Sequence, residues 1–353
     1  MYYRNSKIVN LNRIFDQNSR QGYLRLDLNE NPGGLPDDFI SNTLREINPE
    51  FLSEYPETLQ FTETLAAHLG VKVENICLVN GSAEGIRYIL EAFTCENGKV
   101  VGVVPTYAMF EVYCKMYGRY FERIPYTDDL KMPVGHILEH LNKDVQLLIL
   151  LNPNNPMGNA YTEEEFKQIL SKAQKEEITV LIDEAYYYFY EKSFLKYALM
   201  YENVFVTRTF SKLFSLAGAR LGYVVGCQNG IELVQKLCTP HNVNAFAQLF
   251  ARKIIETPGM IEQLVHKYKE GRKYLEEMLQ KNSYLYHGEY GNFIFIKPKS
   301  NVRSLIEQMK EKKGILIKSY ADVGILGDCL RVTTGEKKYM ERFVDALLEL
   351  DSI

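Results

Sequence analysis

Residues 207–220 read TRTFSKLFSLAGAR, a stretch in which one lysine, several hydroxyls and an arginine follow an apolar segment of strand length. A lysine just past the end of a buried strand can form a Schiff base with a carbonyl compound. The hydroxyls of Thr209 and Ser211 and the guanidinium of Arg220 suit an anionic group held beside Lys212. A short motif of this kind also fits a loop with an exposed lysine, so the rest of the chain must decide between a site and a loop.

The composition is that of an ordinary globular protein. The chain has 353 residues, of which 46% are hydrophobic and 24% charged, which is enough for a sizeable core. The formal net charge is -4 and no basic run stands out, which argues against nucleic acid or an anionic membrane as a partner. No apolar run approaches the roughly 20 residues that span a bilayer, and the N-terminus lacks the apolar segment of a signal peptide.

The six cysteines are scattered along the chain, without a Cys-x-x-Cys pair or a Cys/His cluster at zinc spacing. Most of them lie inside apolar runs. This pattern predicts reduced core cysteines, no metal site and a cytoplasmic location.

Through the first two thirds of the chain, apolar segments of strand length alternate with helical patterns. The expected strands are residues 76–79, 99–104, 120–124, 145–151, 178–182, 204–206 and 221–225. The expected helices include residues 58–69, 82–93, 106–117 and a segment that a capping box opens at residue 162 and that runs to about residue 175. This alternation predicts an α/β fold with a mostly parallel central sheet flanked by helices.

The remaining parts of the chain predict a smaller α+β domain. A long helical pattern, broken at Pro258-Gly259, covers residues 243–281. Strands are then expected at residues 293–297, 315–318 and 329–333, and helices at residues 302–312 and 337–350, whereas residues 1–27 are polar and irregular. We expect residues 1–45 to form an arm and part of the small domain, residues 46–245 the large domain and residues 246–353 the rest of the small domain.

Polar loops follow the predicted strands at their carboxyl ends, where ligands bind in parallel sheets. One of them, Asn80-Gly81-Ser82, leads into a helix and offers free N–H groups and a positive dipole end to a phosphate, although many α/β loops share this pattern. Asp183 ends an apolar strand, where a carboxylate is costly unless it is paired. It can cap the following helix or pair with a cationic ring nitrogen. Tyr107 offers a flat face for stacking.

Together these groups match one cofactor. Lys212 supplies an amine for an aldehyde, and Asp183 supplies a carboxylate for a pyridinium ring. Donors to a phosphate come from Ser82, Ser211 and Arg220. The cofactor that needs all of these groups is pyridoxal 5'-phosphate (PLP).

The chain resembles the fold-type I PLP-dependent enzymes, in the branch of the histidinol-phosphate aminotransferases. The resemblance runs in order from about Leu28 to the C-terminus and is more specific for the superfamily than for the branch. It is carried by Asn29-Glu30-Asn31-Pro32, Tyr55-Pro56, Asn80 to Glu84, Pro105-Thr106-Tyr107, Asn152 to Gly158, Asp183 to Tyr186, Thr209 to Arg220 and Leu330 to Thr333.

The resemblance implies a role for each matched residue that faces the cofactor. Lys212 would hold PLP and later move the substrate proton, while Asp183 would keep the ring nitrogen protonated. The other implied contacts are Tyr107, Asn155 and Tyr186 to the ring, and Ser82, Ala83, Ser211 and Arg220 to the phosphate. Tyr55 would reach the phosphate bound by a partner subunit, which implies a homodimer with composite sites.

The resemblance is weaker on the substrate side. It implies that Arg331 binds a carboxylate with its two-pronged fork, with Asn31 and Lys318 as further substrate contacts. Lys318 stands where the branch commonly has an arginine for the substrate phosphate, which a lysine binds as a point charge. Met157 replaces a usual threonine, and Tyr23 is a poor positional match for the N-terminal tyrosine of the branch. These departures leave PLP chemistry intact and the substrate open.

Three functions are consistent with these residues. The first is an aminotransferase that takes the amino group of glutamate, by way of pyridoxamine phosphate, and passes it to a phosphorylated acceptor. The second is a decarboxylase of an amino-acid O-phosphate, of the threonine-phosphate or serine-phosphate type, which shares nearly all of these motifs. The choice depends on which Cα bond stands perpendicular to the ring. The third, a PLP-fold regulator without catalysis, is disfavoured by the presence of Lys212. Fold resemblance alone does not fix the substrate.

Overall fold

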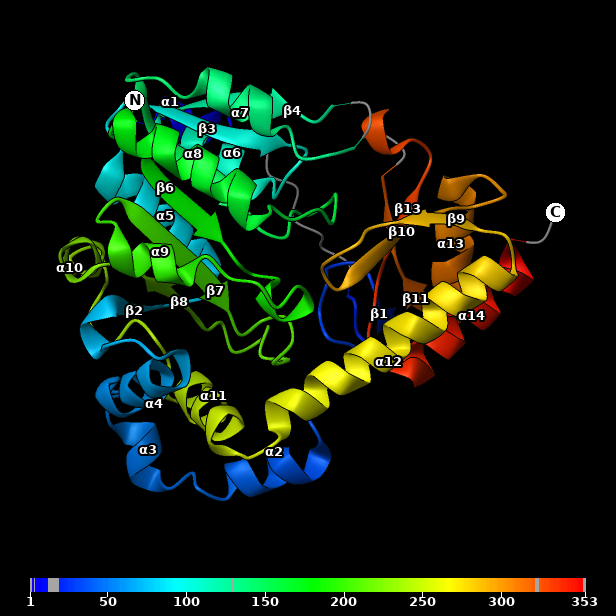
Figure 1. The fold of residues 1–353 in the computed structure, drawn as a ribbon. Coiled ribbons are helices and arrows are strands. Elements are labelled where there is room, and N and C mark those ends of the chain that lie inside the picture. The colour runs from blue at the N-terminus through cyan, green and yellow to red at the C-terminus, as the bar shows by residue number, and fades with distance from the viewer. Residues whose placement is uncertain (1, 3, 12–18, 128–129, 321–323, 352–353) are drawn as a thin grey trace.

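A seven-stranded sheet forms the centre of the larger part of the molecule (Figure 1). The computed structural model describes residues 2, 4–11, 19–127, 130–320 and 324–351. The strands lie in the order β2 (Ile76–Val79), β8 (Gly222–Val225), β7 (Val204–Thr209), β6 (Thr179–Asp183), β5 (Val145–Leu151), β3 (Lys99–Val104) and β4 (Tyr120–Pro125). Strand β8 runs antiparallel to both of its neighbours, whereas the remaining neighbouring pairs are parallel. The predicted mostly parallel sheet is therefore confirmed.

The strands of the large sheet are apolar along their length because helices cover both of its faces. Val180, Leu181 and Ile182 of β6, for example, have no exposed surface. The flanking helices are α4 (Leu59–Leu69), α5 (Ser82–Phe93), α6 (Met109–Tyr117), α7 (Val134–His140), α8 (Glu163–Lys175), α9 (Leu195–Met200) and α10 (Gln228–Gln235). Helix α8 begins at the predicted capping box, in which the Glu165 N–H donates to Thr162 Oγ1 at 3.2 Å.

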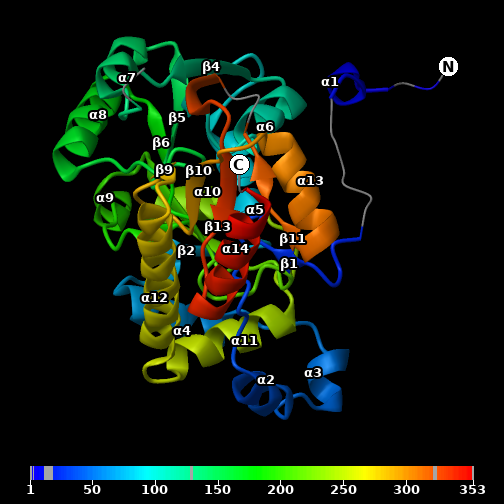
Figure 2. The same ribbon diagram turned by 90° about the vertical axis from the view of Figure 1, so that its right-hand side faces the viewer.

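A small antiparallel sheet lies beside the large one. Its strands lie in the order β12 (Lys318–Ser319), β13 (Leu330–Thr333), β10 (Phe293–Lys297) and β9 (Leu285–His287). Figure 2 looks onto the helices that cover this sheet, α12 (Met260–Lys281), α13 (Val302–Lys313) and α14 (Lys337–Leu350). The predicted helix break is confirmed, since α11 (Ala245–Glu256) ends before Pro258 and α12 follows Gly259.

The N-terminal segment joins this smaller part of the molecule. Strand β1 (Leu24–Arg25) pairs in parallel with β11 (Ile315–Leu316), and the Thr333 N–H donates to the Leu26 carbonyl at 2.8 Å. The smaller part is thus built from both ends of the chain, as predicted. The domain boundaries at residues 45 and 245 remain predictions.

Several local predictions differ from the structure. The strand predicted over residues 315–318 is two short strands in different sheets, because residues 315–316 pair with β1 and residues 318–319 pair with β13. The helix predicted from residue 106 begins at Met109, which leaves Tyr107 in a loop. Among the described residues, six helices were not predicted: α1 (Ser6–Val9), α2 (Asp37–Leu44), α3 (Pro49–Ser53), α7, α9 and α10. The first three bury no apolar side chain, so no apolar periodicity marks them. Helices α7, α9 and α10 do bury apolar side chains, but with 7, 6 and 8 residues they are too short to show a clear period.

The six cysteines are free, and Cys77, Cys114 and Cys329 are buried as predicted. Cys95 is exposed, which contradicts the prediction of core cysteines at that position. Within residues 2, 4–11, 19–127, 130–320 and 324–351, no group of three or more His, Cys, Asp or Glu side chains is placed to hold a metal ion. In the same part of the chain, the helices are too short or too polar to cross a membrane.

Candidate active site

A cavity of about 570 Å³ lies between the carboxyl ends of the large-sheet strands and the small sheet. The large sheet contributes residues at the ends of β5, β6 and β7, and the small sheet contributes Lys318 and Arg331. The predicted site residues that line the cavity are Ser82, Ala83, Tyr107, Asn155, Asp183, Tyr186, Ser211, Lys212, Arg220, Lys318 and Arg331. The structure therefore brings together side chains that lie up to 249 residues apart in the sequence.

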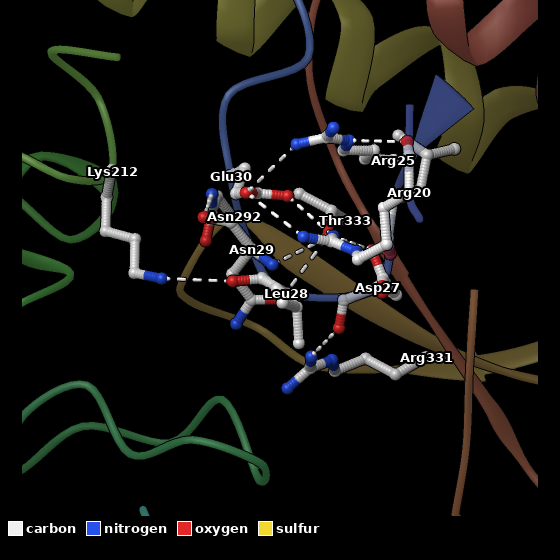
Figure 3. Close-up of polar contacts among 11 residues, drawn as sticks. Arg20, Arg25, Asp27, Leu28, Asn29, Glu30, Lys212, Asn292, Arg331 and Thr333 are labelled. Carbon is white, nitrogen blue, oxygen red and sulfur yellow. Dashed lines mark hydrogen bonds and ion pairs between the residues drawn. The ribbon is translucent and has the colours of Figure 1, made fainter. Parts of the chain in front are cut away.

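Lys212 lies three residues beyond the end of β7 and points across the cavity to the N-terminal segment (Figure 3). Its Nζ donates to the Leu28 carbonyl at 3.1 Å and lies 5.7 Å from the centre of the Tyr186 ring. Burial, assisted by the charge of Arg331, lowers the pKa of Lys212 to about 8. The neutral amine, which is the nucleophilic and basic form, is therefore far more populated near neutral pH than in an ordinary lysine.

Asp183 is the last residue of β6 and is 3% exposed. The Ala185 N–H and the Thr207 hydroxyl both donate to its Oδ1, at 3.1 and 3.3 Å. Burial raises the pKa of Asp183 to about 7. No helix begins at residue 184, so the prediction of a helix cap is wrong; Oδ1 accepts its bonds from a turn and from β7, and Oδ2 has no hydrogen-bond partner among the described residues. The carboxylate is poised to accept a cationic N–H from a ligand.

An anion cradle lies at the N-terminus of α5. The backbone N–H groups of Ser82 and Ala83, in the first turn of the helix, have no partner within it. Arg220 donates from NH1 to Ser211 Oγ at 3.2 Å, which places the guanidinium over the same helix end. Gly81, with φ of 82°, makes this approach possible, since a Cβ there would lie 2.3 Å from Arg220 NH2.

Two asparagines orient the hydroxyl of Tyr186. The side-chain amides of Asn29 and Asn155 donate to the Tyr186 hydroxyl at 2.9 and 3.0 Å. The hydroxyl accepts both bonds, so its own hydrogen is directed elsewhere. Asn29 is a cavity residue that the sequence interpretation missed in favour of Asn31. The bonds predicted from Asn155 and Tyr186 to the cofactor ring, and stacking by Tyr107, remain predictions.

Arg331 is 3% exposed and is fixed by three acceptors. Its NH1 donates to Asn155 Oδ1 at 2.9 Å and to the Tyr320 hydroxyl at 3.0 Å, and its NH2 donates to the Asp27 carbonyl at 2.5 Å. Its Nε is buried without a partner in the described structure. Tyr320, which also lines the cavity, was not predicted from the sequence, because neither a motif nor a periodicity marks it.

The N-terminal segment is held in place on its outer side (Figure 3). Arg20 donates to Asp27 at 2.5 Å and to Glu30 at 2.7 Å. On its inner side, the Asn29 N–H donates to Thr333 Oγ1 at 3.0 Å, and the Asn29 carbonyl accepts from Asn292 at 3.0 Å. These bonds tie the segment to the small sheet, so that the Leu28 carbonyl faces Lys212.

Two predicted site residues lie outside the cavity. The Asn31 amide donates to Ser215 Oγ at 2.8 Å and to the Leu213 carbonyl at 3.4 Å, which anchors the loop after Lys212. Tyr55 is 79% exposed on another face of the molecule, where its ring stacks on His241. The substrate contact of Asn31 and the phosphate contact of Tyr55 across a dimer interface remain predictions.

The donor set of the cavity fits PLP. The anion cradle would hold the phosphate, Lys212 offers an amine to the aldehyde, and Oδ2 of Asp183 is open to the ring nitrogen. Burial raises the pKa of Asp183 even though the charge of Lys212 acts against this shift, and a pyridinium N–H bonded to Oδ2 would favour the ionised carboxylate.

Comparison with known proteins agrees with this fit. Residues 21–347 match the family described as aminotransferase class I and II. The chain is 30% identical over 329 residues to a histidinol-phosphate aminotransferase of Thermoanaerobacter sp. (strain X514), with 92% of each chain covered. A histidinol-phosphate aminotransferase from Sinorhizobium meliloti in complex with pyridoxal-5'-phosphate has a similar fold, with a TM-score of 0.83 and 21% identity over 92% of this chain and 90% of that one.

The fold is also shared by an L-threonine-O-3-phosphate decarboxylase from Porphyromonas gingivalis, with a TM-score of 0.77 and 21% identity over 92% of this chain and 98% of that one. The fold alone therefore does not separate the two chemistries. The family match covers the large sheet, the cavity, and the two cations that the small sheet contributes to the cavity, Lys318 and Arg331. The chain thus belongs to the class I and II aminotransferases, a family of PLP-dependent enzymes.

Proposed function

We propose that this aminotransferase transfers the amino group of glutamate, in two half-reactions, to a small phosphorylated acceptor resembling the substrate of the histidinol-phosphate aminotransferases. The observation that carries the proposal is the pairing of two cations in the cavity. Lys318 of β12 and Arg331 of β13 are directly opposite each other in the antiparallel register, and both line the cavity.

Like charges directly opposite each other destabilise a pair of strands. Burial, together with the charge of Arg331, lowers the pKa of Lys318, which reflects the cost of holding these two cations side by side. A dianionic phosphate bound between them would remove this cost, because each cation would gain an opposite charge. A neutral or cationic substrate group would leave it in place.

When bound, PLP supplies the aldehyde that accepts the amino group and the ring that withdraws electrons from the substrate Cα. Asp183 would hold a proton on the ring nitrogen through Oδ2. Lys212, whose lowered pKa makes the neutral amine accessible, would take the proton from the substrate Cα at Nζ and return it. The Leu28 carbonyl would orient this amine by accepting one of its hydrogens.

The test is to mix PLP-loaded protein with L-glutamate in the absence of an acceptor. About one 2-oxoglutarate per active site is expected, because the amino group remains on the enzyme until an acceptor arrives. Failure to release 2-oxoglutarate, together with release of carbon dioxide from phosphothreonine or phosphoserine, would replace transamination by the second candidate, an amino-acid O-phosphate decarboxylase. The same two cations would bind the phosphate of such a substrate.

A second copy of this chain would complete the cavity with Tyr55. The Tyr55 ring is held by stacking on His241, with the ring centres 4.6 Å apart at an angle of 17°, although most of its surface is exposed. Leu52 and Leu59, which lie within four positions of Tyr55 in the sequence, are also exposed apolar side chains. Exposed apolar side chains of this kind are suited to contact with another protein surface, and a two-fold axis would make the contribution reciprocal.

Mixing two inactive variants tests this composite site. If Tyr55 serves the partner, a hybrid dimer of Lys212→Ala and Tyr55→Ala chains contains one intact site, so a random equal mixture should recover about a quarter of the wild-type activity. Recovery requires subunit exchange, which mass spectrometry of differently tagged chains would establish. Hybrid dimers without activity would place Tyr55 outside the partner's site.

A further inference from the structure

The position of Tyr320 is fixed by the small sheet. Its backbone N–H donates to the Cys329 carbonyl at 3.0 Å, which extends the pairing of β12 with β13 by one residue. Its ring packs edge-on against the buried Phe295 of β10, with ring centres 5.0 Å apart at 78°. The side chain therefore enters the cavity from a rigid support, in the same wall as Lys318 and Arg331.

The hydroxyl of Tyr320 is oriented by Arg331. The guanidinium NH1 donates to this hydroxyl at 3.0 Å, so the oxygen is used as an acceptor on that side. Tyrosine can also donate one hydrogen bond, and no acceptor for it is present among the described residues. Burial raises the pKa of Tyr320, which keeps the hydroxyl protonated at neutral pH. The hydrogen is available to a ligand in the cavity.

The Tyr320 ring also lies beside both cations. Lys318 Nζ and Arg331 Cζ are each 5.4 Å from the centre of the ring, within the range of a favourable cation–π contact. The ring thus offsets part of the repulsion between these cations when no anion is bound to them. An anion held by both cations lies within reach of the hydroxyl, because the hydroxyl is already bonded to one of them.

We propose that Tyr320 determines specificity for a phosphate over a carboxylate, its hydroxyl donating the third hydrogen bond to a phosphate held between Lys318 and Arg331. A phosphate monoester has three terminal oxygens in a tetrahedral arrangement, which three separate donors can match. A carboxylate has two oxygens in one plane, which a single guanidinium can satisfy. Loss of the hydroxyl should therefore weaken phosphate binding far more than carboxylate binding. This inference rests on the phosphorylated substrate of the proposed function.

The experiment titrates PLP-loaded protein with ethyl phosphate and, separately, with glutarate, using calorimetry. Ethyl phosphate should bind Tyr320→Phe about tenfold more weakly than it binds the wild type, the loss expected for one hydrogen bond to a charged group. Glutarate affinity should change by less than about threefold, because the ring and Arg331 remain. Tyr120→Phe is the matched control, since Tyr120 is 60% exposed on β4 and should leave both affinities unchanged.

The two probes separate the specificity role of Tyr320 from the proposal of a phosphorylated substrate. Equal weakening of both probes in Tyr320→Phe would make Tyr320 a general support for Arg331 and overturn the specificity role, as would unchanged affinity for both. If wild-type protein binds glutarate but not ethyl phosphate, the phosphorylated substrate of the proposed function fails instead. A Tyr320→Leu variant, which also removes the ring, should lose affinity for both probes and so separates the ring from the hydroxyl.

Discussion

Lys212 Nζ lies 3.1 Å from the Leu28 carbonyl oxygen (Figure 3). The reactive amine, which follows a strand of the large sheet, is thus hydrogen-bonded to the N-terminal segment, which belongs to the smaller part of the molecule. The segment is itself tied to β13 through Thr333 and Arg331. The amine is therefore positioned by both parts of the molecule. A substitution in the N-terminal segment should therefore change the position of the Lys212 amine while leaving the large sheet intact.

Replacing Lys212 by alanine removes both the amine that binds the PLP aldehyde and the base at the substrate Cα. Lys212→Ala should not become covalently labelled with PLP on borohydride reduction, which intact-mass spectrometry would measure, and transamination should fall at least about 1,000-fold. Lys273→Ala is the matched control, since the Lys273 side chain is 78% exposed on α12. Covalent labelling of the Lys212→Ala protein at another lysine would remove this residue from its role.

Gly81 tests the anion cradle. In Gly81→Ala the new Cβ would lie 2.3 Å from Arg220 NH2, on a residue with φ of 82° that alanine adopts at a cost. The guanidinium must move away from the end of α5, so PLP affinity should fall by about tenfold or more, as measured by equilibrium dialysis. Gly135→Ala in α7, where a Cβ meets nothing within 4 Å, should leave PLP affinity unchanged. Equal effects of the two substitutions would argue against the cradle.

Asp183 makes the stability of the PLP-free protein depend on pH. Burial raises its pKa from an ordinary 3.8 to about 7, so the folded protein binds this proton more tightly than the unfolded chain does. The stabilisation that this group contributes is present in full below pH 3.8 and is lost as the pH rises to about 7. The free energy of unfolding should fall by up to about 4 kcal/mol over this range, at 1.36 kcal/mol per pKa unit.

The free energy of unfolding of the PLP-free protein, measured by denaturant titration between pH 4 and 8, should therefore decrease with pH more steeply in the wild type than in Asp183→Asn. Asparagine keeps the shape and cannot ionise, so it removes this titration. Bound PLP should flatten the wild-type curve, because the pyridinium N–H pairs with the carboxylate. Parallel curves for the two PLP-free proteins would reject the raised pKa.

Much of the large sheet and its site could be predicted from the sequence. Strands β2 and β5 are continuous apolar runs because both of their faces are buried, and their boundaries match the prediction. The cavity residues of the large sheet follow such strands directly, so their meeting at one edge of the sheet follows from the alternation of strands and helices. Lys212 and Asp183 could be found in this way.

The small-sheet side could not be predicted in the same detail. Asn29 and Asn31 belong to one motif, and only the backbone decides which of them faces the cavity; Asn29 adopts φ of 57° and bonds to Tyr186. Tyr320 and Arg20 act through contacts that the three-dimensional fold creates, and neither lies in a periodic segment. The exchange of sheets between residues 316 and 318 likewise depends on pairing with distant strands.

Removing Lys318 should change stability and function in opposite directions. In Lys318→Gln the like-charge pair with Arg331 across β12 and β13 is lost, so the PLP-free protein should become more stable by about 0.5 kcal/mol. Affinity for ethyl phosphate should fall by about tenfold, since one of two cations that would hold the phosphate is gone. Denaturant titration and calorimetry measure the two effects.

Lys297→Gln is the control and should change neither stability nor affinity. Lys297 is an exposed strand lysine of β10, and its register partner is Leu285. A variant that is less stable and binds ethyl phosphate as the wild type does would show that Lys318 supports the strand rather than the substrate, and the paired cations would then no longer carry the proposal of a phosphorylated acceptor.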